Sequence, residues 1–210
     1  VRDYAESVLK PDALAADTEG VSAARIAELS GLGLLNHLAP AEFGGAEVSR
    51  AADRRIHEIL AGACFNTWLV WAQHGPVVGR LTTALADRQP SPLARRILTG
   101  RLLVGAALSD IRRYPDHYIR AEQTTGGWLL SGTISWVSGW GLNSALAVGA
   151  VDPKSESVVT ALLPVDHHTR SEHLELSALG GSRTDRVTLD RAFVAAEDKL
   201  SEGDIAGAEA

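Results

Sequence analysis

The sequence is poor in sulfur. Its 210 residues include one cysteine and no methionine. A lone Cys64 excludes an internal disulfide framework and a zinc site built from several thiolates. Its neighbours Ala63 and Phe65 are apolar, so we predict a small buried thiol at this position. Because methionine is absent and the chain begins at Val1, we expect a fragment trimmed at one or both ends. A valine start codon or processing is the alternative.

Positive charge and long apolar runs are also scarce. Lys and Arg number 20 against 26 Asp and Glu, which gives a net charge of -6. Nucleic-acid binding needs a basic surface, so we expect no nucleic-acid partner. No apolar run approaches the ~20 residues that span a bilayer, and the acidic, amphipathic N-terminus is unlike a signal peptide. We therefore expect no membrane partner and a cytoplasmic location.

The first half of the chain has helical patterns. Ser22 and Ser49 are typical N-caps of helices with apolar stripes, and Ser91-Pro92 combines a capping hydroxyl with proline in the first turn. Residues 67–73 continue the helical pattern with an apolar wall that contains two tryptophans. We predict an all-α helical domain over residues 1–101.

The second half changes to short β-prone runs separated by Gly, Pro, Asp and Asn. Regular strands at such spacing favour a sandwich or small barrel. The fold class predicted is therefore α+β, with an N-terminal helical domain followed by a small antiparallel β-barrel or sandwich domain over residues 102–200. Residues 201–210 are acidic and rich in Gly and Ala, which predicts a linker or frayed tail. The expected strands are residues 102–108, 118–124, 128–133, 144–151, 157–163 and 186–194.

The segment 126–139 contains the most informative pattern. Gly126 and Gly127 predict a hairpin turn, and the strand that follows carries Trp136 and Ser138. Alternation along a strand puts these two side chains on one face. A flat aromatic beside a small hydroxyl suits a flat heteroaromatic ligand, which needs stacking and a hydrogen bond at its edge. The alternative stays open, because a strand tryptophan is commonly part of the core.

Other candidate sites have competing structural interpretations. His167, His168 and His173 could hold a metal, but their polar loop setting favours solvated histidines. His74 lies where a helix meets a loop, and a capping or core histidine is favoured. The Gly-rich segment 179–185 could approach a phosphate or ring through its amides, or form a tight connection between strands.

Read in order, several segments resemble the first two domains of the acyl-CoA dehydrogenase superfamily. The similar elements cover nearly the whole chain, and their order and spacing make the match specific. They are Pro40-Ala-Glu-Phe-Gly-Gly45, Leu98-Thr-Gly-Arg101 running into residues 103–110, Gly127-Trp-Leu-Leu-Ser-Gly-Thr133 with Trp136-Val-Ser138, and Leu179-Gly-Gly-Ser182 with residues 187–194.

The resemblance implies FAD as cofactor and assigns its contacts. Trp136 would pack against the isoalloxazine, with Val137 close to the ring, and the Ser138 hydroxyl would bond the N5 edge. Leu108 and Ser109 would meet the pyrimidine edge. Donors at these edges tune a flavin.

The resemblance also implies a two-electron oxidation with hydride transfer to flavin N5, by a homo-oligomer (a dimer or tetramer). The family's third domain, which supplies the catalytic base, is not expected in this chain, so no catalytic residue is assigned. The family has a Gly-rich turn where this chain reads Ser109-Asp-Ile-Arg-Arg-Tyr-Pro-Asp116, which puts an acyl thioester substrate in doubt, although Arg112 and Arg113 could bind its phosphates.

Two alternatives are a flavin-dependent monooxygenase on the same fold and a non-catalytic shortened paralogue acting as partner subunit. The family counterparts of Trp68, Trp71 and Val77 face the substrate cavity or third domain, so these residues are expected to form an uncovered apolar surface.

Overall fold

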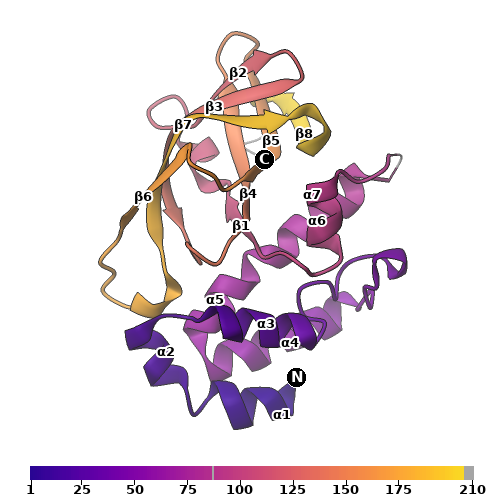
Figure 1. Ribbon diagram of the computed structural model, residues 1–210, viewed down its shortest axis with the longest axis vertical. Helices are drawn as coiled ribbons and strands as arrows, with labels where there is room; N and C mark the ends of the chain where they lie inside the picture. The colour runs from indigo at the N-terminus through magenta and orange to yellow at the C-terminus, as the bar shows by residue number, and fades with distance from the viewer. Residues whose placement is uncertain (87, 206–210) are drawn as a thin grey trace.

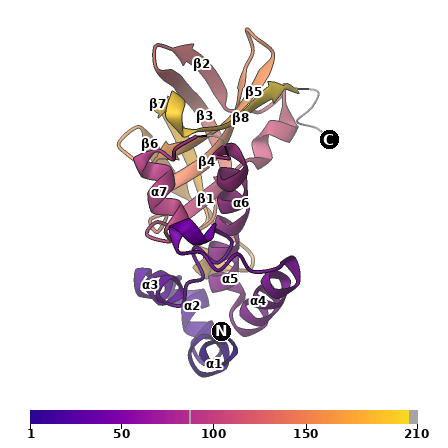
Figure 2. The same ribbon diagram turned by 90° about the vertical axis from the view of Figure 1, so that its right-hand side faces the viewer.

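The chain divides into a helical part and a β part. The computed structural model describes residues 1–86 and 88–205. Most helices gather at one end and the sheet at the other (Figure 1). In the turned view, helices α6 (His74–Ala84) and α7 (Pro92–Leu98) lie between the remaining helices and the sheet (Figure 2). The predicted α+β class is confirmed.

Short helices capped by serine build the helical part. Ser22, Ser49 and Ser91 each accept the backbone N–H of the residue three positions later, so the three predicted N-caps are confirmed. The other helical elements are α1 (Arg2–Tyr4), η1 (Ala5–Leu9), α2 (Ala13–Glu19), α3 (Ala23–Gly31), η2 (Ala41–Phe43), α4 (Arg50–Ala63) and α5 (Phe65–Ala72).

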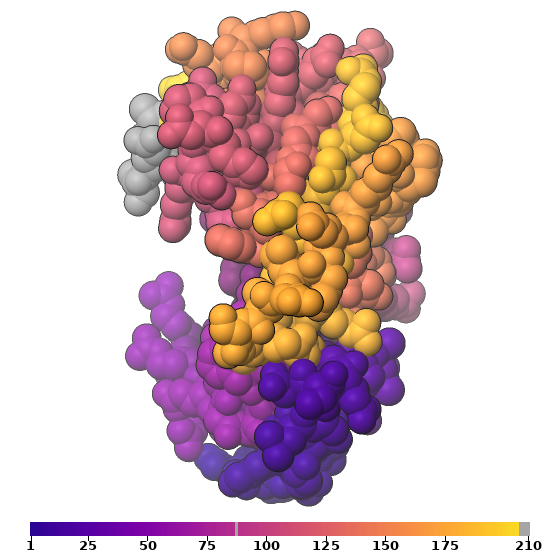
Figure 3. Space-filling model, turned by 90° about the vertical axis from the view of Figure 1, so that its left-hand side faces the viewer, coloured from indigo at the N-terminus to yellow at the C-terminus, as the bar shows by residue number. Residues whose placement is uncertain are grey.

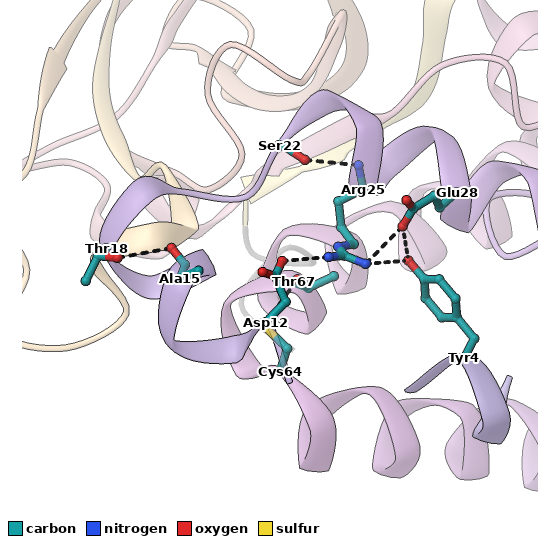
Figure 4. A network of polar contacts seen from close by, with 9 residues as sticks. All are labelled: Tyr4, Asp12, Ala15, Thr18, Ser22, Arg25, Glu28, Cys64 and Thr67. Carbon is teal, nitrogen blue, oxygen red and sulfur yellow. Dashed lines mark hydrogen bonds and ion pairs between the residues drawn. The ribbon is translucent and has the colours of Figure 1, made fainter. Parts of the chain in front are cut away.

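Arg25 ties the first helices together (Figure 4). Its guanidinium donates to Asp12 at 2.7 Å and to Glu28 at 2.9 Å, and it bonds the Tyr4 hydroxyl at 3.1 Å. Burial is the main cause of a raised pKa at Tyr4, so this hydroxyl keeps its proton and donates it to Glu28 at 2.6 Å. The network fixes α3 against α1 and against the N-cap of α2.

The predicted buried thiol is confirmed. Cys64 is 3% exposed and accepts the hydroxyl proton of Thr67 at 3.2 Å (Figure 4). Two of the three residues predicted to form an uncovered apolar surface are also buried, since Trp71 is 1% exposed and Val77 is 0% exposed. That prediction is wrong for both. The Trp71 indole donates to the Leu34 carbonyl at 2.8 Å, so its polar edge is satisfied inside the protein.

Eight strands form one mostly antiparallel sheet. Their order is β6-β7-β3-β2-β4-β5-β8, and β1 pairs with β4. The pairs β1–β4 and β2–β4 are parallel. The strands are β1 (Val104–Ala107), β2 (Arg120–Thr124), β3 (Gly127–Val137), β4 (Ala145–Asp152), β5 (Ser157–Pro164), β6 (Thr169–His173), β7 (Asp185–Ala195) and β8 (Lys199–Asp204).

Strands β6 and β8 were not expected from the sequence. Both carry mostly exposed polar side chains, so neither shows the apolar alternation that indicates a strand. Residues 201–204 were predicted to be linker or frayed tail, but they form part of β8 because their backbone pairs with residues 157–160 of β5. Of the remaining tail, Ile205 donates its backbone N–H to the Glu156 carbonyl at 3.3 Å, and residues 206–210 lie outside the described residues.

The loop around η4 (Gly180–Ser182) joins the sheet to the N-terminal helices. Val21 donates its backbone N–H to the Gly181 carbonyl at 2.9 Å, and Arg183 donates its Nε–H to the Val21 carbonyl at 2.7 Å. A Cβ on Gly181 would lie 1.7 Å from the Ala16 carbonyl oxygen, so only glycine allows this approach. Figure 3 shows the corresponding face, where β6 and the loop after it (orange) run down onto the indigo helices.

His74 joins the two parts from inside. Its Nε2 lies 2.6 Å from the Leu35 carbonyl oxygen, and its Nδ1 accepts the backbone N–H of Val104 at 3.1 Å. These partners fix a neutral ring with the proton on Nε2. Complete burial lowers the pKa of His74 to about 4, which keeps the ring neutral at physiological pH. The interpretation as a core histidine is confirmed.

Candidate functional site

Trp136 is the main feature of the site. It lies at the end of β3 and is 58% exposed, whereas Trp128 on the same strand is 6% exposed and belongs to the core. Val137, the residue after Trp136, is fully buried in the core of the β part, so the Trp136 side chain points to the opposite face. An indole this open on an ordered strand offers a flat apolar surface to a ligand or partner.

Ser138 was predicted to lie on the same strand as Trp136, but β3 ends at Val137, so Ser138 lies in the turn that follows and is held there from several sides. Its hydroxyl lies 3.0 Å from that of Thr184, and Thr184 lies 2.8 Å from the hydroxyl of Ser182. Asn143 donates its side-chain N–H to the Ser138 carbonyl at 2.8 Å, and Gly139 donates its N–H to the Ser182 carbonyl at 2.9 Å. Ser138 thus ends a chain of three hydroxyls in a fixed backbone.

Sequence reasoning missed Thr184 and Ser182 as partners of Ser138. The segment 179–185 was considered for its backbone amides, and the structure uses it instead to deliver two hydroxyls and to contact helix α2. No local pattern signals this pairing, because more than 40 residues separate Ser138 from Thr184 along the chain.

Leu108 and Ser109 follow strand β1. Leu108 is half-buried and lines a cavity of about 570 Å³, and Ser109 is exposed at the start of η3 (Ser109–Arg113). Arg80 and Arg112 line the same cavity, together with the acidic Glu202 and Asp204 of β8. Leu108 therefore lies at the wall of a recess that mixes both signs of charge.

Asp110 connects this segment to the end of β3. Its carboxylate is 3% exposed and accepts two hydrogen bonds from Ser135, one from the backbone N–H at 2.8 Å and one from the hydroxyl at 2.7 Å. The structure thus joins Asp110 to Ser135, whereas the cavity beside Leu108 is lined by other elements and by none of residues 135–138. Neither Asp110 nor Ser135 was selected from the sequence, although each is a direct neighbour of a selected residue.

The two arginines considered for phosphate binding are separated in the structure. Arg113 donates to the Ser135 hydroxyl at 2.8 Å and lies 3.5 Å from Asp110. Arg112 instead lines the cavity beside Leu108. Of the two, Arg112 is the one placed to meet an anion in the recess.

The helical part closes on the end of β3. A Cβ on Gly139 would lie 2.9 Å from Cγ1 of Val70 on α5, so this helix packs directly behind Ser138. A second, largely apolar cavity of about 360 Å³ lies between α3, residues 100–103 and residues 141–144. The predicted site is therefore a junction of the two parts of the molecule.

Two of the three histidines considered for metal binding have other partners. His168 lies 2.9 Å from the Asp190 carbonyl oxygen, and His173 lies 3.1 Å from the Asp185 carboxylate. Within residues 1–86 and 88–205, no three His, Cys, Asp or Glu side chains are grouped as metal ligands. Of the helices described, none is long and apolar enough to cross a bilayer.

The residues at the junction fit a flavin in chemical type. Trp136 supplies an exposed aromatic face, Ser138 and Ser109 supply hydroxyls, and Leu108 supplies apolar surface. Because its side chain is buried, Val137 could reach a ligand only through its main chain. Such a set can stack on a flat ring and bond its polar edges, and it contains no group arranged for nucleophilic catalysis.

Comparison with known proteins points to one family. Residues 1–100 match the model of the acyl-CoA dehydrogenase N-terminal domain. The human mitochondrial short-chain specific acyl-CoA dehydrogenase is 24% identical over 213 residues, which cover 96% of this chain and 51% of that protein. The chain thus spans about half the length of this curated relative.

Solved structures share the fold. Glutaryl-CoA dehydrogenase from Mycobacterium smegmatis has a TM-score of 0.79 at 21% identity, covering 99% of this chain and 55% of that one. The 3-HSA hydroxylase from Rhodococcus sp. RHA1 has a TM-score of 0.77 at 18% identity, covering 95% and 50%. The FAD complex of PigA has a TM-score of 0.80 at 16% identity, covering 99% and 57%. The family match, the human relative and these structures all point to the acyl-CoA dehydrogenase superfamily, and they bear out the predicted resemblance of this chain to the N-terminal part of its proteins.

Proposed function

We propose that this chain forms the flavin-facing part of an FAD-dependent oxidoreductase of the acyl-CoA dehydrogenase type. The exposed Trp136, followed two residues later by the fixed Ser138 hydroxyl, is the observation that carries this proposal. FAD, when bound, would accept the two electrons of the oxidation as a hydride. An acyl thioester substrate and a homo-oligomeric assembly are part of the proposal and rest on the family.

Each residue has a distinct role in this proposal. Trp136 stacks on the ring system, and Ser138 donates a hydrogen bond to its N5 edge. Leu108 and Ser109 meet the pyrimidine edge, and Val137 contributes main-chain atoms near the ring. The chain of hydroxyls behind Ser138 holds its oxygen in place, which favours a preorganised donor over a mobile one.

Binding of FAD to the 210-residue chain tests the proposal. The Trp136 surface is open, whereas a pocket normally buries most of its ligand, so we expect weak binding. Trp136→Ala should weaken it further by about 1–3 kcal/mol, as an aromatic stacking surface contributes. Ser138→Ala should change the affinity little and shift the flavin reduction potential, because it removes one edge donor.

Quenching of flavin fluorescence measures the affinity, and Phe193→Ala is the matched control. Phe193 is 47% exposed on β7, so it is also an open aromatic on a strand of the same sheet. Equal effects of Trp136→Ala and Phe193→Ala would contradict the proposed site. Equal loss of affinity from Trp136→Ala and Ser138→Ala would contradict the division of roles.

A flavin-dependent monooxygenase is the second candidate. Residues 109–113 form η3 where the family has a Gly-rich turn, and the 3-HSA hydroxylase shares the fold. A protein that contains this chain should distinguish the two activities. Salt-sensitive binding of acyl-CoA that is lost in an Arg80→Ala/Arg112→Ala variant supports the dehydrogenase. Absence of acyl-CoA binding, together with a long-lived oxygen adduct of the reduced flavin, supports the monooxygenase.

A further inference from the structure

We propose that Asp110 is a positioning residue that sets the orientation of Trp136 by holding the backbone of Ser135. The inference rests on the proposed function for the use of Trp136, but the positioning itself is a property of this chain. Asp110 directly follows Ser109, and Ser135 directly precedes Trp136. One carboxylate therefore joins the two segments that are proposed to meet the flavin.

The backbone before Trp136 is irregular. The pairing of β3 with β7 shifts register between Ile134 and Val137. Ile134 and Ser135 are both buried, so the alternation of exposed and buried side chains is interrupted there. Beyond this bulge, the direction of the Trp136 side chain depends on how the backbone of Ser135 is held.

Asp110 replaces the missing strand partner. Its Oδ2 accepts the Ser135 backbone N–H at 2.8 Å, and its Oδ1 accepts the Ser135 hydroxyl at 2.7 Å. Two bonds to one residue fix both its main chain and its side chain. A carboxylate is suited to this role because it is an acceptor with two oxygens.

The buried charge of Asp110 is compensated locally. Arg113 Nη1 lies 3.5 Å from Oδ1 and donates to the Ser135 hydroxyl at 2.8 Å. His117 Nε2 lies 3.6 Å from the same carboxylate and 3.3 Å from the Ser135 hydroxyl. A carboxylate that is 3% exposed is costly without such partners. The cluster is thus a connected network around Ser135.

Three substitutions separate positioning from general stability. Asp110→Ala removes both bonds to Ser135, and Ser135→Ala removes only the hydroxyl bond. Asp110→Asn keeps an oxygen for the backbone N–H and offers an N–H₂ group to the hydroxyl, so it should largely rescue the geometry. Asp152→Ala is the matched control. Asp152 is 8% exposed and accepts the Lys154 backbone N–H at 2.9 Å after β4.

The readout without cofactor is ¹⁹F NMR of the chain labelled with 5-fluorotryptophan. The Trp136 resonance is assigned with Trp136→Phe. Asp110→Ala should shift and broaden this resonance while the signals of the other four tryptophans keep their positions. Ser135→Ala should give a smaller shift, and Asp110→Asn and Asp152→Ala should give almost none. An unchanged Trp136 resonance in folded Asp110→Ala would overturn the proposal. If Asp110→Ala does not fold, an unchanged resonance in Ser135→Ala overturns it.

FAD affinity separates this inference from the proposed function. Asp110→Ala should weaken FAD binding about tenfold, since a misplaced aromatic loses part of its stacking. If Asp110→Ala moves the Trp136 resonance but neither it nor Trp136→Ala changes FAD affinity, positioning stands and the proposed flavin site fails. If Trp136→Ala weakens FAD binding while Asp110→Ala alters neither resonance nor affinity, the flavin site stands and positioning fails.

Discussion

The helical part and the β part hold their irregular backbone in the same way, although their regular structure differs. In the helical part, the loop after α3 depends on side chains, because Trp71 bonds the Leu34 carbonyl and His74 bonds the Leu35 carbonyl. In the β part, hydrogen bonds between paired strands hold most of the backbone. At the bulge, the Asp110 carboxylate accepts the Ser135 N–H instead. Buried polar side chains act where neither a helix nor a ladder supplies a partner.

Loss of His74 should be the most damaging single change to this arrangement. His74→Ala leaves the Leu35 carbonyl and the Val104 N–H without partners in the interior and opens a cavity. We expect the free energy of unfolding to fall by about 3–5 kcal/mol. Urea unfolding measures this, and His167→Ala, which removes an exposed histidine, should change it by less than about 0.5 kcal/mol. Similar effects would show that His74 does not join the two parts.

Acid should weaken the same joint. The pKa of His74 is about 4 in the folded protein, below the ~6.5 of an unfolded chain, so the unfolded state binds the proton more readily. The contribution of neutral His74 is complete above about pH 6.5 and is lost as the pH falls toward 4. The free energy of unfolding should fall by about 3 kcal/mol over this pH range, because the ring is fully buried. Unfolding across this pH range measures it, and the difference between the chain and His74→Gln isolates the contribution. If the chain and the His74→Gln variant showed the same pH dependence of stability, His74 would not be the group that makes the joint sensitive to acid.

A smaller effect is expected at the contact between the parts. Gly181→Ala places a methyl group against the Ala16 carbonyl, where a Cβ would lie 1.7 Å from the oxygen. To relieve this overlap, the η4 loop must move away from α2, which should lower the free energy of unfolding by about 1–3 kcal/mol. Gly62→Ala is the control, because the added Cβ would have no heavy atom within 4 Å. Gly126 is unsuitable as a control because its φ is positive. Thermal unfolding compares the two, and equal melting temperatures would show that close docking at Gly181 is dispensable.

Local patterns predicted the regular elements and little of the polar bonding between them. Serine caps marked the starts of α3, α4 and α7, and apolar alternation located most central strands. Strand β8 escaped because backbone pairing with β5 forms it, and its exposed side chains carry no periodic signal. Patterns of this kind describe neighbours along the chain, not pairs across the fold.

The same limit applies to the candidate site. Alternation predicted that Trp136 and Ser138 share one face of a strand, but β3 ends at Val137 and Ser138 lies in the turn that follows. The bonds from Asp110 to Ser135 and from Thr184 to Ser138 join residues 25 and 46 positions apart, and the fold alone brings these together. The family resemblance identified residues whose roles in flavin binding are still proposals.

The chain of hydroxyls from Ser182 through Thr184 to Ser138 has a consequence for the direction in which these hydrogen bonds run. Each hydroxyl has a single proton, so when Ser138 donates outward, Thr184 must donate to Ser138, and Ser182 must donate to Thr184. The three bonds therefore reverse or align together, and aligned bonds polarise one another. Ser182 directly follows Gly181, whose carbonyl accepts the Val21 N–H, so the hydroxyl chain begins in the loop that joins the β part to the helical part.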